Sequence, residues 1–264
     1  MSAAPRPTIL ITGAAAGIGL AVAERFARAG WFVGLYDLDE ATVQIHRQRL
    51  CAEHGIAGRL DVAKAGDWTE ALQGFAQASG GRLDVLFNNA GVSVTLPFEQ
   101  APLARHQLVV DVNLKGVING CHSAHALLKA THHSRVINMC SASALHGQPE
   151  LASYSATKAA VRGLTEALDI EWRGQGIRVV DVLPLFVNTA MVRDDVSRMR
   201  TVKMLGVRLS ADDVAQAVWS LSQRDPRRLP VHTHVGLQTK FFALLSKLSP
   251  GWVNHWVTAK MAGY

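Results

Sequence analysis

Short runs of apolar and β-branched residues alternate with helical patterns along most of this 264-residue chain. The runs expected to form strands cover residues 8–12, 31–37, 56–62, 83–88, 135–140, 177–183 and 229–235. The helical patterns cover residues 17–29, 39–53, 68–78, 102–130, 153–173 and 210–221. Continuous apolar strands that alternate with helices are typical of a parallel sheet covered on both faces. The alternation therefore predicts an α/β fold with a doubly wound parallel sheet.

Residues 1–235 contain no linker, repeat or low-complexity stretch, so we expect them to form one domain. From Gly236 the pattern changes to an apolar extension, residues 236–264. Its large apolar residues include Phe241, Phe242, Leu244, Leu245, Leu248, Trp252 and Trp256. We expect it to pack as helices over a pocket or a subunit interface, because large exposed apolar patches are rare. A membrane-surface helix is the competing interpretation, and it is disfavoured because Lys240 and Lys247 are the only cations near the apolar run.

Charge and cysteine content exclude several classes of protein. Lysine and arginine (27) exceed aspartate and glutamate (21), but they are dispersed, which favours a basic surface over a nucleic-acid-binding face. Three cysteines without a Cys-x-x-Cys pair indicate reduced thiols, and the scattered histidines predict no metal site. Because no apolar run reaches 18 residues, we expect a soluble, cytoplasmic protein.

A glycine-rich segment follows the first expected strand and opens the first expected helix: Thr12-Gly13-Ala14-Ala15-Ala16-Gly17-Ile18-Gly19. Glycines let the backbone approach a pyrophosphate, whose charge faces the free N–H groups at a helix start. Asp37 ends the next strand, 24 residues after Gly13, where a carboxylate accepts hydrogen bonds from both ribose hydroxyls of an adenosine. The pattern predicts a dinucleotide site and favours NAD.

Tyr154 and Lys158 are four residues apart in an expected helix, so the phenol and the ammonium share one helix face. A cation beside a phenol favours the phenolate and lowers a pKa that is ordinarily about 10. A tyrosine in such a pair exchanges protons closer to neutral pH. On its own, however, this spacing is also common among surface pairs.

Taken together, these motifs resemble those of the short-chain dehydrogenase/reductase family. They are the Thr12–Gly19 segment, Asn88-Asn89-Ala90-Gly91, Asn113, Ser141 and Tyr154-x-x-x-Lys158, in this order along the chain. The resemblance covers residues 8–235 and implies a Rossmann-type fold. It also implies an oxidoreductase that transfers a hydride between NAD(H) and an alcohol or carbonyl substrate.

The resemblance implies a catalytic role for four residues. Tyr154 is the general acid or base that exchanges a proton with the substrate oxygen. Lys158 lowers the pKa of that phenol and holds the nicotinamide ribose, while Ser141 orients the substrate oxygen. Asn113 holds a water that links Lys158 to solvent. Two donors at one oxygen suit the alkoxide-like charge that develops on it during hydride transfer.

The resemblance also implies a set of cofactor-binding residues. They are Gly13, Gly17, Ile18, Gly19, Asp37, Asp61, Val62, Asn89, Ala90, Gly91, Tyr154, Lys158, Pro184, Val187 and Thr189. Within this set, Asp61 and Val62 resemble the adenine contact. The chain departs from the family pattern at Cys140, where serine is common, and at Leu185, where glycine is usual. Leu185 would place a large side chain beside the nicotinamide and the substrate.

We therefore expect an NAD-dependent oxidoreductase that interconverts an alcohol and a ketone or aldehyde, with a homodimer or homotetramer implied by the resemblance. The substrate is expected to be apolar, because residues 186–207 should fold over the pocket as a lid rich in apolar side chains. Arginines in the same segment leave an anionic group on the substrate open. The alternatives are an NADP-linked carbonyl or 3-oxoacyl reductase and a non-catalytic dinucleotide-sensing protein. The intact set around Tyr154 argues against a sensor, which needs no proton donor.

Overall fold

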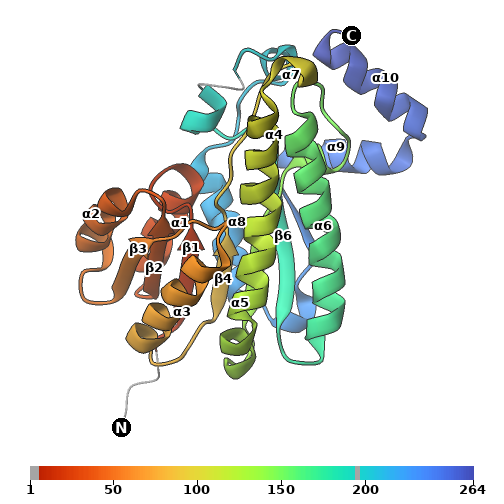
Figure 1. Ribbon diagram of the computed structural model, residues 1–264. Helices are drawn as coiled ribbons and strands as arrows, with labels where there is room; N and C mark the ends of the chain where they lie inside the picture. Colours follow the sequence, from red (N-terminus) through yellow and green to blue (C-terminus); the bar gives the residue numbers. More distant parts are fainter. Residues whose placement is uncertain (1–5, 194–196) are drawn as a thin grey trace.

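The structure is a computed structural model that describes residues 6–193 and 197–264 of the chain. At its centre lies a parallel sheet with the strand order β3-β2-β1-β4-β5-β6-β7 (Figure 1). The strands are β1 (Thr8–Thr12), β2 (Phe32–Asp37), β3 (Gly55–Arg59), β4 (Val85–Asn88), β5 (Arg135–Met139), β6 (Arg178–Pro184) and β7 (His232–Val235). This arrangement confirms the doubly wound parallel sheet predicted from the sequence.

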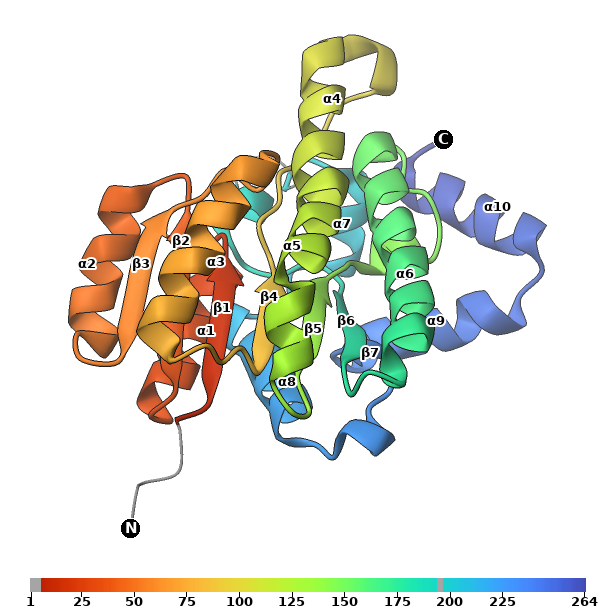
Figure 2. The ribbon, with the colours of Figure 1, turned by 60° about the horizontal axis from the view of Figure 1, so that its bottom comes forward.

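Helices cover both faces of the sheet (Figures 1 and 2). One face carries α1 (Gly17–Arg28), α2 (Glu40–Cys51) and α8 (Ala211–Gln223). The other face carries α3 (Ala65–Ser79), α5 (Gly116–Ala130) and α6 (Ala152–Arg173). The remaining helices lie near the carboxyl ends of the strands or beyond β7: α4 (Leu103–Val110), α7 (Arg200–Leu205), α9 (Leu237–Leu248) and α10 (Gly251–Ala262).

Strand β1 shows why its sequence is apolar throughout. Ile9 and Ile11 belong to the core cluster that contains Phe26 of α1, whereas Leu10 belongs to the opposite cluster with Trp68 of α3. All five side chains of β1 are buried. Burial of a large apolar side chain contributes roughly 1.5–3 kcal/mol, so both layers of helices hold the central strand in place.

The helix predicted over residues 102–130 is interrupted in the structure. A π-helical turn, Asp111–Lys115, lies between α4 and α5 and completely buries Asn113. A π turn changes the backbone hydrogen bonding without ending the helix, so the sequence pattern of residues 102–130 still predicts a single helix. Such turns are frequent at functional sites.

The largest differences from the predicted strand bounds, three residues each, occur at two strand ends. The strand expected at residues 56–62 ends at Arg59, because the backbone N–H of Asp61 donates to Oδ2 of Asp67 at 3.0 Å. The strand expected at residues 229–235 begins only at His232, because a 3₁₀ turn precedes it. Both differences are local and leave the strand order unchanged.

The C-terminal extension forms α9 and α10, which we call the C-terminal helix pair. Figure 2 shows the pair as an elbow on the β7 side of the sheet, far from α2. Asn254 of α10 closes the elbow by donating from Nδ2 to the carbonyl oxygen of Ser246 at 3.0 Å. Among the described residues, no helix is both long and apolar enough to span a membrane.

Candidate active site

The turn between β1 and α1 forms a cradle of backbone at the carboxyl end of β1. Gly13 and Gly17 have φ angles of +67° and +57°, which side chains disfavour. A Cβ at Gly19 would lie 2.1 Å from the carbonyl oxygen of Gly13, so the close approach requires glycine. No described side chain caps the N-terminus of α1, and its first turn contains no acidic residue. Free N–H groups at such a terminus fit the pyrophosphate of a dinucleotide.

The segment that follows β4 is hydrogen-bonded to this cradle. Asn89 Nδ2 donates to the carbonyl oxygens of Thr12 and Gly13 at 2.9 and 3.1 Å. The backbone N–H groups of Asn89 and Ala90 donate to Thr12 Oγ1 at 3.0 and 3.1 Å. The strand order reverses between β1 and β4, which is where ligands bind in such sheets. The motifs in the sequence predicted no separate role for Thr12, although its place at the end of the strand indicates one.

Asp37 lies at the end of β2 beside the cradle. Its Oδ2 accepts a hydrogen bond from the N–H of Ala15 at 3.0 Å, and its Oδ1 accepts one from Asp39 at 3.1 Å. These two bonds fix a half-buried carboxylate at the edge where the ribose of an adenosine would lie. Asp39 itself caps α2 by accepting from the N–H of Thr42. Asp37 is therefore not needed as the helix cap.

Other expected cofactor positions lie along the same edge of the sheet. A Cβ at Gly17 would lie 3.4 Å from Cγ2 of Thr189, so the loop after β6 reaches the cradle. Asp61 follows β3, and its Oδ1 accepts from the N–H of Ala63 at 3.2 Å. The carbonyl oxygen of Val62 already accepts two side-chain hydrogen bonds, at 3.1 and 3.0 Å. A contact between Val62 and an adenine would therefore use its N–H or its side chain rather than this carbonyl oxygen.

Ser141, Tyr154 and Lys158 come together where β5 ends and α6 begins. Ser141 and Tyr154 both line one cavity, and the Ser141 side chain acts to lower the pKa of the phenol. Lys158 Nζ lies 5.5 Å from the centroid of the Tyr154 ring and donates to the carbonyl oxygen of Met139 at 2.7 Å. The structure thus brings the hydroxyl groups of Ser141 and Tyr154 and the buried ammonium of Lys158 close together.

Burial controls the protonation of this group. It raises the pKa of Tyr154 to about 12, although the Ser141 side chain partly offsets the effect. Burial also lowers the pKa of Lys158 to about 8. The pKa of the phenol is therefore shifted upward, opposite to the lowering expected from the sequence, because desolvation of the phenol dominates. Tyr154 is consequently a neutral proton donor at pH 7, and Lys158 changes its charge near pH 8.

The side chain of Asn113 holds the loop after Gly91. Its Nδ2 donates to the carbonyl oxygen of Val92 at 2.9 Å, and its Oδ1 accepts from the N–H of Val92 at 2.8 Å. Both amide atoms are thus bonded to the segment after Gly91. A water in the expected relay to Lys158 would have to bind to the backbone of the π turn.

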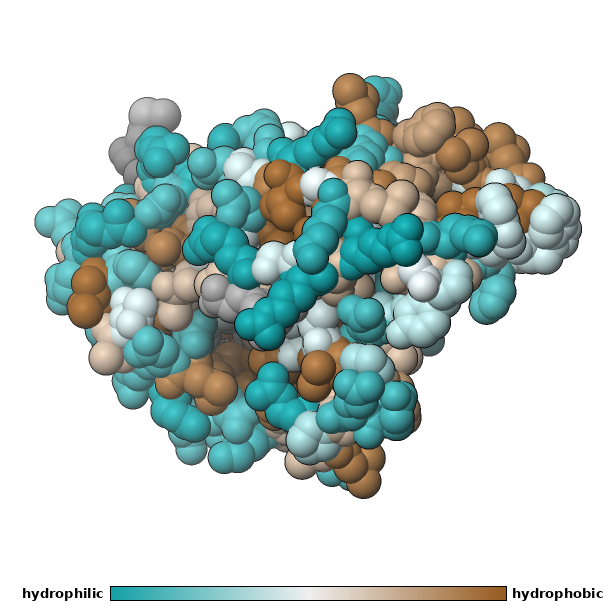
Figure 3. Space-filling view, turned by 90° about the horizontal axis from the view of Figure 1, so that it is seen from above, coloured by the Kyte–Doolittle hydropathy of each residue, from teal (hydrophilic) through white to brown (hydrophobic). Residues whose placement is uncertain are grey.

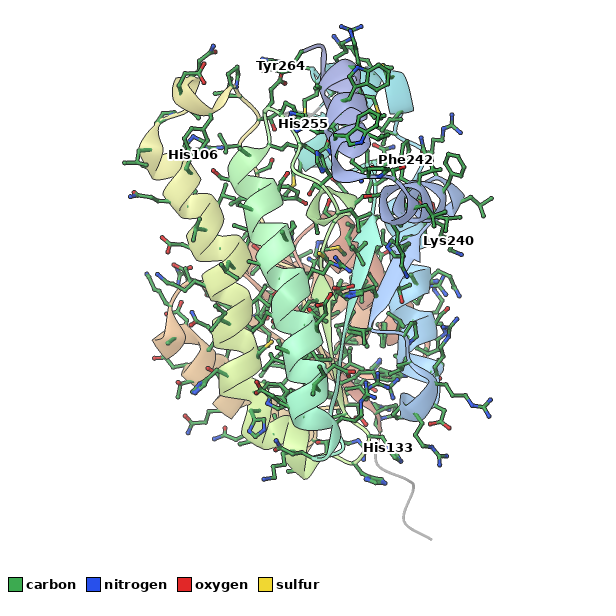
Figure 4. The ribbon with its side chains drawn as sticks, turned by 90° about the vertical axis from the view of Figure 1, so that its right-hand side faces the viewer. His106, His133, Lys240, Phe242, His255 and Tyr264 are labelled. Carbon is green, nitrogen blue, oxygen red and sulfur yellow. The ribbon has the colours of Figure 1, made fainter. Side chains whose placement is uncertain are left out.

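A cavity of about 330 Å³ adjoins Ser141 and Tyr154. Apolar side chains from the turn after β5, the expected lid and the C-terminal helix pair surround it. They include Leu145, Leu151, Leu185, Phe186, Met191, Val192, Leu205, Phe242, Leu245, Val253, Val257 and Met261. Of the described residues that line it, none is Asp, Glu, Lys or Arg. Figure 4 labels Lys240 and Phe242 on α9 and His255 on α10.

This lining bears on two expectations from the sequence. Leu185 stands in the wall, so its large side chain limits the space beside the reacting groups. The expected lid, residues 186–207, contributes Met191, Val192 and Leu205, while its residues 194–196 lie outside the described part of the chain. The cavity is therefore suited to a neutral, apolar molecule.

His232 of β7 has structural partners on β6 and α6. His232 Nδ1 lies 2.9 Å from Oδ2 of Asp181, and its Nε2 lies 2.9 Å from Oε1 of Glu166. These hydrogen bonds raise the pKa of His232 and connect β7 to β6 and α6. Within the described ranges, no group of three or more His, Cys, Asp or Glu residues is arranged to hold a metal ion.

Comparison of the sequence with known proteins identifies relatives along most of its length. A family model described as short chain dehydrogenase matches residues 7–200. A 3β-hydroxysteroid dehydrogenase of Eggerthella lenta is 32% identical over 228 residues, 82% of this chain and 87% of that protein. A mitochondrial borneol dehydrogenase of Lavandula x intermedia is 34% identical over 228 residues, 84% and 86% of the two chains. An uncharacterized short-chain type dehydrogenase/reductase of Sinorhizobium fredii is 32% identical over 222 residues, 81% of this chain but 40% of that protein.

Solved structures with the same fold contain either nicotinamide dinucleotide. A 3-ketoacyl-(acyl-carrier-protein) reductase from Brucella melitensis complexed with NADH aligns with a TM-score of 0.79 and 28% identity, over 87% of this chain and 96% of that one. A serine dehydrogenase complexed with NADP⁺ aligns with a TM-score of 0.78 and 25% identity, over 86% and 94%. The fold therefore accommodates both dinucleotides.

Proposed function

This chain belongs to the short-chain dehydrogenase/reductase family of oxidoreductases, and we propose that it transfers a hydride between NAD(H) and a neutral, apolar alcohol or ketone. The observation that carries the proposal is the uncharged apolar cavity that adjoins Tyr154 and Ser141. Two relatives are named for apolar alcohols, a hydroxysteroid and borneol, which supports this substrate class.

The residues around the cavity account for the proton chemistry. A nicotinamide dinucleotide held by the glycine cradle, Asp37 and Lys158 would supply or accept the hydride. In reduction, neutral Tyr154 donates its phenolic proton to the substrate oxygen, while Ser141 donates a second hydrogen bond to the developing negative charge. The Lys158 ammonium, 5.5 Å from the ring, stabilises the phenolate that remains. In oxidation, the phenolate accepts the alcohol proton.

The preference for NAD(H) rests on Asp37. Its carboxylate is fixed beside Ala15 at 3.0 Å, so a phosphate on the adenosine ribose would face a like charge. Ala16 and Leu38, at the neighbouring positions, offer no cation to bind that phosphate. These residues support NAD(H) over the alternative of an NADP-linked carbonyl or 3-oxoacyl reductase.

A substrate panel tests the proposal. Steady-state rates at the NADH absorbance band would be compared for a steroid alcohol, a bicyclic terpene alcohol, a 2-hydroxy acid and a 3-oxoacyl carrier thioester. We expect the highest kcat/KM with an apolar alcohol or its ketone, and with NAD(H). The Tyr154→Phe variant serves as the control for contaminating activity. The highest kcat/KM with an anionic substrate would contradict the proposal.

The same proposal includes a cytoplasmic homodimer or homotetramer, with residues 1–235 as the catalytic domain and residues 236–264 as its extension. The support for assembly is the apolar surface of α5 and α6, where Ile118 and Ile170 are 44% and 76% exposed. Exposed apolar side chains on neighbouring helices are typical of subunit interfaces. Sedimentation velocity measures the oligomeric mass. We expect a dimer or tetramer for the wild type and a smaller mass for Ile118→Ser/Ile170→Ser.

A further inference from the structure

The C-terminal helix pair presents apolar side chains to its outer surface as well as to the cavity. Those on α9 follow the three- and four-residue spacing of one helix side, and the two on α10 are four residues apart. Each of them is more than half exposed. They are Leu237, Phe241, Leu244, Leu248, Trp252 and Trp256, which we call the outer apolar face.

The substrate cavity does not explain the outer apolar face. Phe242 lines the cavity, whereas its neighbour Phe241 is 58% exposed. On α10, Val253 lines the cavity while Trp252 is 74% exposed. In the view from above, hydrophobic residues gather over the part of the molecule where α10 lies (Figure 3). Exposed apolar patches of this kind mark binding surfaces.

The charge of the helix pair indicates what kind of surface it binds. Residues 236–264 contain no Asp or Glu, and Lys240, Lys247 and Lys260 are all exposed. In a twofold interface the same patch meets itself, so these lysines would approach like charges without an acidic partner from the pair. A second copy of this chain is therefore disfavoured, and an anionic surface is favoured. The exposed apolar face and the absence of Asp and Glu from residues 236–264 thus reverse the preference drawn from the sequence against a membrane surface.

We propose that the outer apolar face and the three lysines dock the protein on an anionic lipid surface. Each helix has 12 residues and is about 18 Å long, shorter than a hydrocarbon core of about 30 Å, so the pair lies along the interface. Indole side chains such as those of Trp252 and Trp256 suit the headgroup boundary. Lysines near an anionic leaflet add to the attraction.

Docking through these helices has a consequence for substrate access, which rests on the proposed function. The inner side of the same pair forms one wall of the cavity. An apolar alcohol dissolved in the bilayer would therefore meet the enzyme where the cavity is formed. The docking itself depends only on the outer apolar face and the lysines.

Vesicle co-sedimentation of the full chain tests the electrostatic part. We expect binding to phosphatidylcholine vesicles that contain phosphatidylserine, and at least about tenfold weaker binding to phosphatidylcholine alone. Lys240→Glu/Lys247→Glu should lose at least about tenfold in binding. The control Arg28→Glu/Lys129→Glu makes the same change in net charge at exposed positions outside the pair and should bind like the wild type. Equal binding by the two variants would overturn the proposal.

Tryptophan quenching by brominated lipids tests the outer apolar face itself. Trp252 and Trp256 are exposed, whereas the other four tryptophans are buried or half-buried. We expect quenching in the wild type and its loss in Trp252→Phe/Trp256→Phe, which should still sediment with vesicles. Quenching that is unchanged in this variant would place the contact elsewhere and overturn the proposal.

Two further outcomes are decisive. The proposal fails if the wild type binds no vesicles and Phe241→Ser/Leu248→Ser has a lower oligomeric mass than the wild type. The outer apolar face would then be a subunit interface. Activity on a water-soluble alcohol should be unchanged in the lysine and tryptophan variants, because none of these four residues lines the cavity. The two proposals can therefore fail separately. A protein that binds no vesicles can still be active on an apolar alcohol, and a protein without this activity can still bind vesicles.

Discussion

Removing the charge of Asp37 should narrow the preference for NAD(H) over NADP(H) while leaving the glycine cradle intact. The carboxylate is fixed by the N–H groups of Ala15 and Asp39, at 3.0 and 3.1 Å. A phosphate on the adenosine ribose would lie against it. Two unit charges about 4 Å apart repel by roughly 1 kcal/mol in water and roughly 4 kcal/mol at an effective dielectric constant of about 20.

Asp37 is half-buried, so the real repulsion lies between these limits. We expect the wild type to favour NADH over NADPH by about tenfold to a thousandfold in kcat/KM. Asp37→Asn removes the charge but keeps the shape and one acceptor oxygen, so the ratio should fall toward unity. Asp37→Ala should also weaken NADH binding, because the ribose hydroxyls lose their acceptor. NADPH should improve only modestly, since Ala16 and Leu38 provide no cation.

The assay is the ratio of kcat/KM values for NADH and NADPH at a fixed, saturating concentration of the carbonyl substrate. Asp39→Asn is the matched control, because it removes a neighbouring charge that caps α2 and keeps a good capping residue. Its cofactor ratio should match that of the wild type. A wild type that prefers NADPH, or an Asp37→Asn variant with an unchanged ratio, would refute the reasoning.

Three further perturbations address the reacting groups and the cradle. Tyr154→Phe should lower kcat by at least about 10²–10⁴-fold with NADH binding nearly unchanged, and a variant that keeps most of its activity would show that another group supplies the proton. Carbonyl reduction should slow as the pH rises through about 8, because the lowered pKa of Lys158 removes its ammonium there; a flat pH profile through this region would contradict the assignment. Gly19→Ala should abolish NADH binding followed by fluorescence, because its methyl group would lie 2.1 Å from the carbonyl oxygen of Gly13. The matched control Gly163→Ala, in open space on α6, should bind NADH normally and gain up to about 1 kcal/mol in urea unfolding.

The sequence predicted the sheet because its strands are apolar on both faces. In β1, Leu10 packs on one layer while Ile9 and Ile11 pack on the other, so the run is continuous rather than alternating. The π turn around Asn113 was not predictable in this way. It changes the backbone hydrogen bonding within a segment whose residues otherwise have a helical pattern.

The sequence predicted that Tyr154 and Lys158 lie together, but not the direction of the pKa shift of the phenol. The four-residue spacing places Tyr154 and Lys158 on one helix face, as the structure shows. The direction of the Tyr154 pKa shift depends on how completely the fold buries the phenol, which the local spacing does not reveal. The apolar extension likewise predicted helices, but only the structure separates Phe242, which lines the cavity, from the exposed Phe241.

The bonds between Thr12 and Asn89 join residues that are 77 positions apart. The dinucleotide cradle is therefore complete only after a long loop has closed and β4 has paired with β1, a non-local step that is slow in parallel sheets. A chain that is still unfolded, or a fragment that ends before β4, lacks one side of the cradle. Any ligand of the cradle thus selects the complete native state and stabilises it by about 2.7 kcal/mol at a hundredfold excess over its Kd. The lifetime of this enzyme in a cell would then follow the supply of its dinucleotide.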